Sequence, residues 1–564
     1  MSVATSAIDD LANRAWDVLL AADPLQATVI GEHAYDDRLP DISPAGHAAR
    51  VAQYEALLKE ADGLTPDPAH SEDALTLSAL RSSVEAALAK ERADPTTYTV
   101  DVMWGMQTDL LTMASYQPLR NPEDGRMLLE RWRAIAPTMD QVVANLREGQ
   151  AAGLLPIRTS AERVAEQLTA EFAAPSEEDG LLAPLQERPE EGWSDGDWHR
   201  FADDLQRIVE GSARPAFQRF LAYVQSEAVR HAREPELAGI GNLPGGAAIY
   251  RALVRGETTS ELEPEQIHAT GLAEVERIDA ELAELGGRVL GATSLAATQA
   301  ALRDDPRMQF ETGEQIVEVA ERSLARAQEA TPRWFGRLPR TPCVVTRMLP
   351  AEEEHSTVAY YRDPAADGSR PGEYYVNTSH PETRPRYEAE ALSFHEAVPG
   401  HHLQVALSQE LPDTLPALRR HSYLMAYVEG WGLYSERLAN EMGLYSGDID
   451  RLGMLSYDAW RACRLVVDTG MHALGWSRDQ AISFMREHSA LAQNNIVNEV
   501  DRYLGRPGQA LAYKIGQLEI LRLRREAEAR LGAAFDIRAF HDAVLGHGPL
   551  PLATLAEAVA ADLA

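Results

Sequence analysis

The sequence contains little cysteine and little positive charge. Only two cysteines, Cys343 and Cys463, occur among 564 residues. Because they lie far apart in sequence, no disulfide framework is indicated, and this usage fits a reducing compartment. Lysine and arginine number 53 against 87 aspartate and glutamate residues, so the formal net charge is −34. Nucleic acids and anionic membranes bind basic surfaces, and this charge therefore argues against both as partners.

Long apolar segments are also missing. No run of about 18 apolar residues occurs, so no transmembrane helix is expected. The segment from Met1 to Asp10 lacks the basic region and apolar core of a signal peptide, which predicts a cytoplasmic protein. Hydrophobic residues make up 45% and charged residues 25% of the chain, as in ordinary globular proteins.

Apolar residues recur at helical spacing through most of the chain, for example in 122–149 and 266–285. Strand patterns occur in three short segments, and a helical pattern follows them from residue 386. We therefore predict a mainly α protein with a small β-sheet beside a metal-bearing helix. The predicted organisation is two lobes around a cleft, a helical N-terminal lobe at 1–340 and a metal-bearing catalytic lobe at 341–564. The predicted strands are 342–347, 357–361 and 373–378.

One stretch concentrates groups that bind metals. His395 and Glu396 begin an imperfect match to the zinc-peptidase helix motif H-E-x-x-H, in which two histidines one turn apart bind zinc. Pro399 occupies the position of the second histidine, and His401 and His402 follow it. Three histidines and a glutamate within eight residues favour a metal site over ordinary packing histidines.

A straight helix does not bring these histidines to one metal ion. Residues six apart point to different faces, and residues seven apart share a face but are separated by about 10.5 Å along the axis. Pro399 removes an amide donor, and Gly400 tolerates unusual backbone angles, so we expect a kink or bulge there. With that break, His395 and His401 are the predicted zinc ligands, and His402 is the alternative to His401.

The third zinc ligand is expected on the next predicted helix. Catalytic zinc usually has three protein ligands and one open position. Glu429 lies 28 residues after His401, and we predict that its carboxylate completes the site. Glu436, two turns further along the same helix, either orients a ligand or is the ligand itself.

The same residues indicate a hydrolytic mechanism. Zinc activates water and polarises a carbonyl, and Glu396 beside His395 can accept the proton of that water and pass it to the leaving amine. Tyr513 is the favoured donor to the oxyanion, because the turn at 507–509 can deliver the start of its helix to a cleft. His472 is a second catalytic candidate. The predicted substrate-binding residues are Tyr375, Asn377 and Arg502.

Several motifs together resemble the bacterial family known as the DUF885 proteins. They are YYVN at 374–377, HEAVPGHHLQ at 395–404, EGWGLYSE at 429–436, RLVVDTGMH at 464–472 and PGQALAYKIG at 507–516. The resemblance runs over nearly the whole chain and implies the fold better than the function. The sequence is also distantly similar to gluzincin-type helical zinc peptidases, in which two histidines and a glutamate bind zinc.

These observations predict a zinc-dependent metallopeptidase that hydrolyses short peptides in a deep cleft. A zinc-dependent amidase or esterase is one alternative, and a catalytically inactive peptide-binding protein is another. Glu396 discriminates between them, because hydrolysis needs a base at this position whereas a binding protein does not.

Overall fold

A computed structural model describes residues 6–66, 72–173, 179–186, 188–348, 353, 357–365 and 370–564 of the chain. Helices make up 72% of the structure, and the sheet found among these residues has three strands. The predicted fold class, mainly α with a small sheet, is confirmed. Within the described ranges, no helix has both the length and the apolar character required to cross a membrane.

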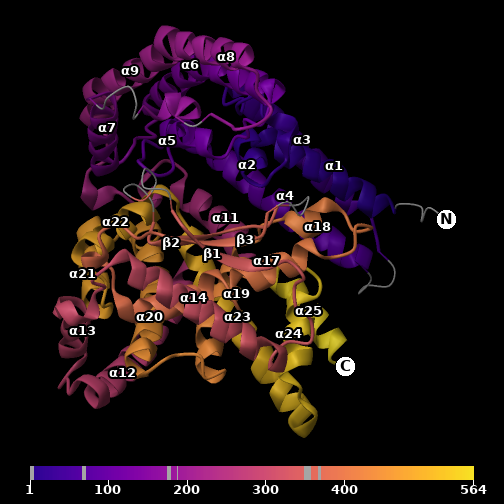
Figure 1. Cartoon of the computed structure of the whole chain (residues 1–564), viewed down its shortest axis with the longest axis vertical. Coiled ribbons are helices and arrows are strands. Elements are labelled where there is room, and N and C mark those ends of the chain that lie inside the picture. The colour runs from indigo at the N-terminus through magenta and orange to yellow at the C-terminus, as the bar shows by residue number, and fades with distance from the viewer. Residues whose placement is uncertain are drawn as a thin grey trace.

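The helices of the first half of the chain run from indigo to magenta in Figure 1, and α1 to α9 fill its upper part. Polar caps begin many of them: the side chains of Ser6, Asn121 and Thr312 accept hydrogen bonds from amides of the first turn of α1, α6 and α14. The helices are α1 (Ala7–Ala22), α2 (Pro24–Val29), α3 (Pro44–Asp62), α4 (Glu72–Ala93), α5 (Met106–Thr112), α6 (Pro122–Ala151), α7 (Arg158–Ala173), α8 (Asp195–Ile208), α9 (Arg214–Tyr223), α10 (Val229–His231), α11 (Gly246–Thr258), α12 (Pro264–Leu290), α13 (Leu295–Asp304) and α14 (Gly313–Ala330).

The second half of the chain contains the sheet and a further set of helices, coloured orange to yellow in Figure 1. The helices are α16 (Ala389–Glu396), α17 (His401–Gln409), α18 (Ala417–His421), α19 (Met425–Glu441), α20 (Asp448–His472), α21 (Arg478–His488), α22 (Gln493–Gly505), α23 (Ala512–Leu531), α24 (Ile537–Leu545) and α25 (Leu552–Asp562).

The sheet contains β1 (Cys343–Arg347), β2 (Ala359–Arg362) and β3 (Gly372–Val376), close to the three predicted strands. Its order is β1-β3-β2, with β1 parallel to β3 and β2 antiparallel to β3. A Cβ on Gly372 would lie 2.4 Å from Nδ1 of His402. The missing side chain at the start of β3 therefore lets the sheet lie directly against α17.

In the described part of the chain, three buried hydrophobic clusters hold the helices together. One joins α5 to α9 with α2 and includes Trp132 and Phe217. A second packs α12 against α20, with Ile278 and Val466 in the interface. The largest joins α1, α4 and α14 to the sheet, α16, α19 and α23. Because this core includes residues from both sides of residue 340, the early helices also support the later part, and the division into two lobes stays a prediction.

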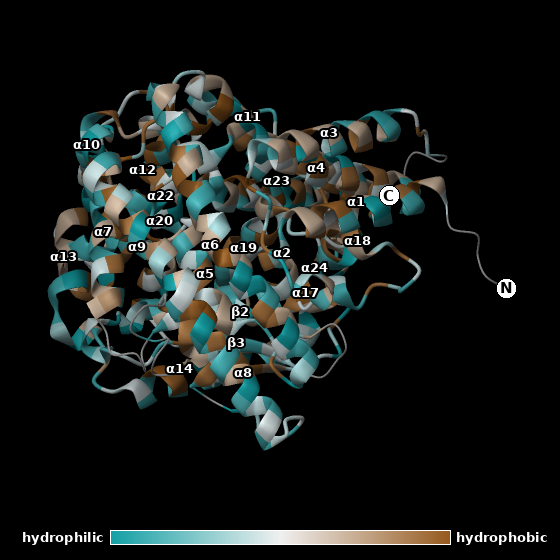
Figure 2. Ribbon diagram, turned by 90° about the horizontal axis from the view of Figure 1, so that it is seen from above, coloured by the Kyte–Doolittle hydropathy of each residue, from teal (hydrophilic) through white to brown (hydrophobic). Residues whose placement is uncertain are grey.

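The helices are amphipathic, as helices around a common core must be. Figure 2 shows brown and teal residues alternating around individual helices, so that one side of a helix is apolar and the other polar. This pattern is the helical spacing from which the fold class was predicted. Helices α19 and α20 depart from this pattern, because most of their residues are buried, including several charged ones.

Candidate metal centre

The stretch that carries the histidines is broken between α16 and α17, as expected. The main chain turns at Pro399 and Gly400, and a Cβ on Gly400 would lie 1.8 Å from the carbonyl oxygen of His395. Glycine is therefore required for so close a return of the chain. Nε1 of Trp431 on α19 donates to the carbonyl of Pro399 (2.9 Å) and anchors the turn. As a result, His401 begins a new helix with its side chain near that of His395.

α19 supplies the side of the centre opposite the two histidines. Glu429, Gly432 and Glu436 are three and four residues apart and share one face of this helix. A Cβ on Gly432 would lie 2.7 Å from Cε1 of His395 and 3.0 Å from Cε1 of His401. Because a methyl group would clash there, glycine lets both imidazole rings approach the helix.

The three predicted ligands converge. Nε2 of His395 and Nε2 of His401 each lie 3.5 Å from Oε2 of Glu429. The ligand atoms that these residues offer all lie within 4.8 Å of one another. Two atoms bound tetrahedrally to one zinc ion at about 2.0–2.1 Å are about 3.4 Å apart. The two spacings of 3.5 Å to Glu429 therefore match a single zinc ion.

Further hydrogen bonds orient two of these side chains. Nδ1 of His395 lies 2.8 Å from Oε1 of Glu436, an arrangement that fixes the ring and leaves Nε2 free for a metal. The hydroxyl of Tyr423 donates to Oε1 of Glu429 (3.1 Å), which leaves Oε2 beside the histidines. Tyr423 is 53% exposed, so it lies where the centre meets solvent.

The centre is buried, and the pKa values of its residues reflect both this burial and the charges of neighbouring residues. Burial would raise the pKa of Glu429, but His395 and His401 hold it well below its usual value. Burial would lower the pKa of His395, but the adjacent carboxylates of Glu429 and Glu436 outweigh this effect and raise it to about 9. Burial raises the pKa of Glu396, against the influence of the two histidines. A carboxyl group with a raised pKa is a better proton acceptor in catalysis.

Several buried polar atoms of the centre have no hydrogen-bond partner in the part of the chain that the structure describes. They are Nδ1 of His401, Oε2 of Glu429 and Oε2 of Glu436. Buried polar atoms are nearly always paired, so such atoms need an explanation. A cation at the convergence point would use Oε2 of Glu429 together with the two Nε2 atoms. The residues therefore fit a zinc ion in donor type, spacing and unused bonding capacity.

His402, the alternative ligand, points away from the other two. Its Nδ1 lies 3.1 Å from the hydroxyl of Tyr361 on β2, and its Nε2 lies 3.1 Å from the carbonyl oxygen of Thr341. Burial lowers the pKa of His402 to about 4. A neutral ring that donates from Nε2 and accepts at Nδ1 satisfies both contacts. The geometry therefore favours His401 as the second ligand.

Tyr513 lies beside the centre because α19 and α23 cross very closely. A Cβ on Gly516 would lie 1.8 Å from the carbonyl oxygen of Ala426 and 2.7 Å from Cα of Gly430. The two glycines thus permit backbone contact between the helices. The ring of Tyr513 stacks 6.4 Å from that of His395, which suits the predicted role of its hydroxyl.

Two further predicted site residues, Arg502 and His472, lie close to each other, because His472 contacts the residue that follows Arg502 on α22. Arg502 donates to Gln509 and to Glu499. Burial raises the pKa of Tyr513, and the positive charge of Arg502 partly opposes this rise. Both nitrogens of His472 are engaged by main-chain groups, since Nδ1 accepts from the amide of Ile240 and Nε2 contacts the carbonyl oxygen of a residue on α22. These contacts are typical of a packing residue, and neither of them joins His472 to the ligand cluster.

The structure does not bring Tyr375 and Asn377 into the cluster either. The hydroxyl of Tyr375 donates to Glu373 (3.2 Å), and its ring stacks on that of Tyr360. Nδ2 of the buried Asn377 donates to the carbonyl of Glu353 (2.6 Å). These contacts stabilise the sheet and the loop after it. The substrate-binding roles of both residues stay predictions.

Two residues of the centre were not predicted from the sequence. Gly432 carried a signal, because a glycine three residues after Glu429 is costly inside a helix and needs a reason. Tyr423 carried none, since it precedes α19 and reaches Glu429 only through the fold.

The fold and the cluster define a mainly α protein with a buried candidate metal centre of two histidines and a glutamate. The chain belongs to the DUF885 family, described as bacterial protein of unknown function, whose family model matches residues 24–559. The family resemblance read from the motifs is confirmed, whereas the similarity to gluzincin peptidases stays an expectation. A comparison with curated proteins finds no match.

Two solved structures share the fold over almost the whole chain. One, the "putative lipoprotein from Colwellia psychrerythraea", has 27% sequence identity and a TM-score of 0.90, and the match covers 99% of this chain and 98% of that one. The other is a "putative lipoprotein of unknown function from Shewanella oneidensis", with 18% identity, a TM-score of 0.75, and coverage of 98% and 99%. The word lipoprotein applies to those proteins, and the cytoplasmic location expected for this chain stays a prediction.

Proposed function

We propose that the protein is a zinc-dependent metallopeptidase that hydrolyses short peptides. The observation that carries the proposal is the convergence of His395, His401 and Glu429, in which Oε2 of Glu429 has no hydrogen-bond partner among the described residues. Glu396 follows His395 directly in the sequence. Three protein ligands with one position left open are typical of catalytic rather than structural zinc.

The residues divide the chemistry between them. Zinc, when bound, supplies a water of lowered pKa and polarises the peptide carbonyl. Glu396 accepts the proton of the attacking water and delivers it to the leaving amine. The Tyr513 hydroxyl donates a hydrogen bond to the oxyanion that forms. Burial raises the pKa of Tyr513, so this hydroxyl keeps its proton at neutral pH. Glu436 holds His395 in the orientation that presents Nε2.

Metal content of matched histidine variants tests the ligand set. His401→Ala should lose zinc, whereas His402→Ala should keep it, because both nitrogens of His402 already have partners. Elemental analysis of the two purified proteins, with melting temperature as the control for folding, provides the measurement. Full zinc in folded His401→Ala protein, or loss of zinc only from His402→Ala, would refute the assignment.

Glu396→Gln tests the chemistry. The change is nearly isosteric, so zinc content and melting temperature should be retained while turnover falls by a factor of about 10² to 10⁴. Glu557→Gln, an exposed position on α25, is the matched control. The assay is mass spectrometry of a mixed peptide library incubated with each zinc-loaded protein. Undiminished turnover would contradict the mechanism. Cleavage of simple amides or esters but of no peptide would favour the amidase or esterase, and no turnover by the unchanged protein would favour a binding protein.

A further inference from the structure

Two arginines on α20 carry free hydrogen-bond donors close to the candidate metal centre. Arg461 and Arg464 are one helical turn apart, and they are 4% and 3% exposed. Nε and Nη1 of Arg461 and Nη1 of Arg464 have no partner in the described part of the protein. Donors on a buried charged group are costly to leave unpaired. Such donors therefore point to a ligand that completes their hydrogen bonding.

Aromatic rings fix the planes of both guanidinium groups. Cζ of Arg461 lies 4.2 Å and Cζ of Arg464 lies 4.4 Å from the ring centroid of Trp460. Arg461 also lies over the ring of Tyr457 (4.3 Å). Stacking occupies the faces of a guanidinium group and leaves its N–H groups to bond in the plane. The donors are thus held ready for an acceptor.

Both arginines reach the centre through a single intervening side chain. Nη2 of Arg461 lies 3.9 Å from Oε1 of Glu436, and the same oxygen holds His395. Cζ of Arg464 lies 4.5 Å from the ring of Tyr513, which stacks on His395. A ligand that used the free donors would therefore lie beside the proposed catalytic groups.

We propose that Arg461 and Arg464 bind the terminal α-carboxylate of a peptide substrate. The inference rests on the proposed peptidase function and adds the end of the peptide that is recognised. Guanidinium groups match carboxylates in charge and in planar geometry, and the resulting hydrogen bonds are stronger than neutral ones. Anchoring that carboxylate beside the centre directs hydrolysis to bonds near the C-terminal end.

A binding measurement tests the inference without any need for turnover. The probes are N-acetylphenylalanine and its amide, titrated by calorimetry into the zinc-loaded protein. We expect the acid to bind about 10- to 100-fold more tightly, as a charge-assisted hydrogen bond to a buried group implies. Arg461→Met and Arg464→Met should each reduce this preference. Arg451→Met, on the exposed end of the same helix, should preserve it. Equal binding of acid and amide would overturn the inference.

A turnover measurement separates this inference from the proposed function. Unchanged protein should cleave a peptide with a free C-terminus about 10- to 100-fold faster, in kcat/KM, than the same peptide with a C-terminal amide. The Met variants should lose this ratio chiefly through KM. If neither peptide is cleaved while the acid still binds selectively, the peptidase proposal fails and carboxylate binding stands. If a Met variant does not fold, Arg461→Lys replaces it, and this variant should also reduce the preference for the acid. A ratio of one in the unchanged protein would still overturn the inference.

Discussion

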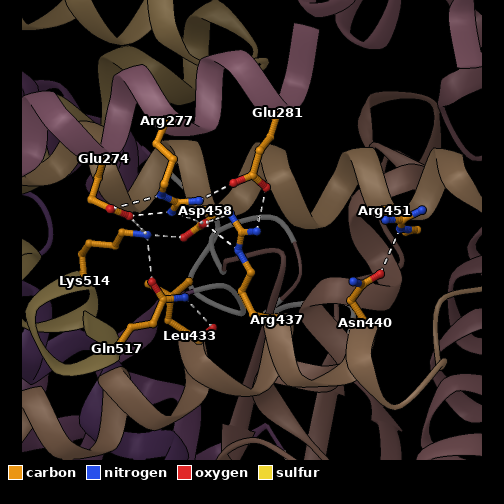
Figure 3. A network of polar contacts seen from close by, with 10 residues as sticks. All are labelled: Glu274, Arg277, Glu281, Leu433, Arg437, Asn440, Arg451, Asp458, Lys514 and Gln517. Carbon is orange, nitrogen blue, oxygen red and sulfur yellow. Dashed lines mark hydrogen bonds and ion pairs between the residues drawn. The ribbon is translucent and has the colours of Figure 1, made fainter. Parts of the chain in front are cut away.

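Two buried polar clusters share helix α19, and they differ in how completely their groups are paired. One is the candidate metal centre. The other, drawn in Figure 3, joins Lys514 of α23 and Asp458 of α20 to Arg437 of α19 and to acidic and basic side chains of α12. Both clusters contain buried charged groups, but only the metal centre has buried polar atoms without partners among the described residues, and this contrast separates a structural network from a ligand site.

The network around Lys514 is complete. Nζ lies 2.6 Å from Oδ1 of Asp458, 2.8 Å from Oε1 of Gln517 and 3.0 Å from Oε2 of Glu274. Arg437 donates to the other oxygen of Asp458. Burial would raise the pKa of Asp458, but Lys514 and Arg437 hold it far below its usual value. Cations and carboxylates therefore balance, and no side-chain atom of these residues is among the unpaired buried atoms of the described structure.

The metal centre, in contrast, contains buried polar atoms that lack hydrogen-bond partners among the described residues. It gathers Glu396, Glu429 and Glu436 around two histidines, and several of its atoms have no partner within the described residues. Neighbouring residues of one helix serve the two clusters: Glu436 holds His395, whereas Arg437 holds Asp458. Successive helical residues point about 100° apart, which separates the clusters. A buried group of charges that lacks partners indicates a place for a ligand.

Removing the cation from the complete network should give the largest effect. Lys514→Met leaves Asp458 and Glu274 short of a buried partner, and the loss of one member of a buried ion pair costs about 3–5 kcal/mol. We expect a fall of that size in the free energy of unfolding, measured by urea denaturation. Zinc content should not change.

The matched change in the metal centre should mainly affect zinc binding and not stability. Glu429→Gln removes one of three carboxylates around two histidines while Glu436 still holds His395, so the metal-free protein should lose less stability than Lys514→Met does, whereas zinc binding should fall sharply. A Lys514→Met protein that loses zinc but not stability would reverse the roles assigned to the two clusters.

The second largest effect concerns the orientation of His395. Glu436→Gln keeps the shape of the side chain but weakens its hold on Nδ1, and the loss of such a supporting group typically costs about 10- to 100-fold in metal affinity. Competition with a zinc chelator measures the affinity. Glu441→Gln, at the exposed end of the same helix, is the control. If Glu436→Gln removes zinc completely and Glu429→Gln retains it, Glu436 is the ligand.

The sequence predicted the fold class, and it named the three residues that converge in the candidate metal centre, largely from local patterns. Helical spacing and three short strand patterns are read from neighbouring residues, and the Pro399-Gly400 pair marks the helix break. The remaining features depend on distant contacts. Tyr423 reaches Glu429 through the fold, and His472 was expected near the centre but is bonded to main-chain groups elsewhere. Spacing along the chain carries no information about such pairings.

A pH experiment extends the comparison to His541, a buried histidine whose two ring nitrogens both have hydrogen-bond partners. Nδ1 of His541 lies 2.8 Å from the carbonyl oxygen of Trp334, and Nε2 lies 2.9 Å from the hydroxyl of Tyr434. Burial lowers the pKa of His541 to about 3, whereas the pKa of His395 is raised. Between about pH 6.5 and 3, the unfolded chain binds a proton that the folded protein does not, so stability is complete above pH 6.5 and falls with decreasing pH.

We expect His541 to contribute a slope of about 1.4 kcal/mol per pH unit, or about 2 kcal/mol of lost stability at pH 5. His541→Gln should flatten the pH dependence of the urea midpoint by this amount, and His199→Gln, an exposed position, should leave it unchanged. An identical slope in His541→Gln and the unchanged protein would show that this ring is protonated in the fold.

The smallest effect is expected at the mouth of the centre. Tyr423 donates one hydrogen bond to Oε1 of Glu429, and Tyr423→Phe removes only that hydroxyl. A single hydrogen bond of this kind contributes about 0.5–1.5 kcal/mol, so zinc affinity should fall about 2- to 10-fold while the fold is retained. Tyr361→Phe, which removes a hydroxyl from His402 instead, is the matched control and should leave zinc affinity unchanged. Chelator competition on both variants provides the comparison. If Tyr361→Phe weakens zinc binding and Tyr423→Phe does not, the metal lies on the His402 side of α17 and the incomplete cluster on α19 has another ligand.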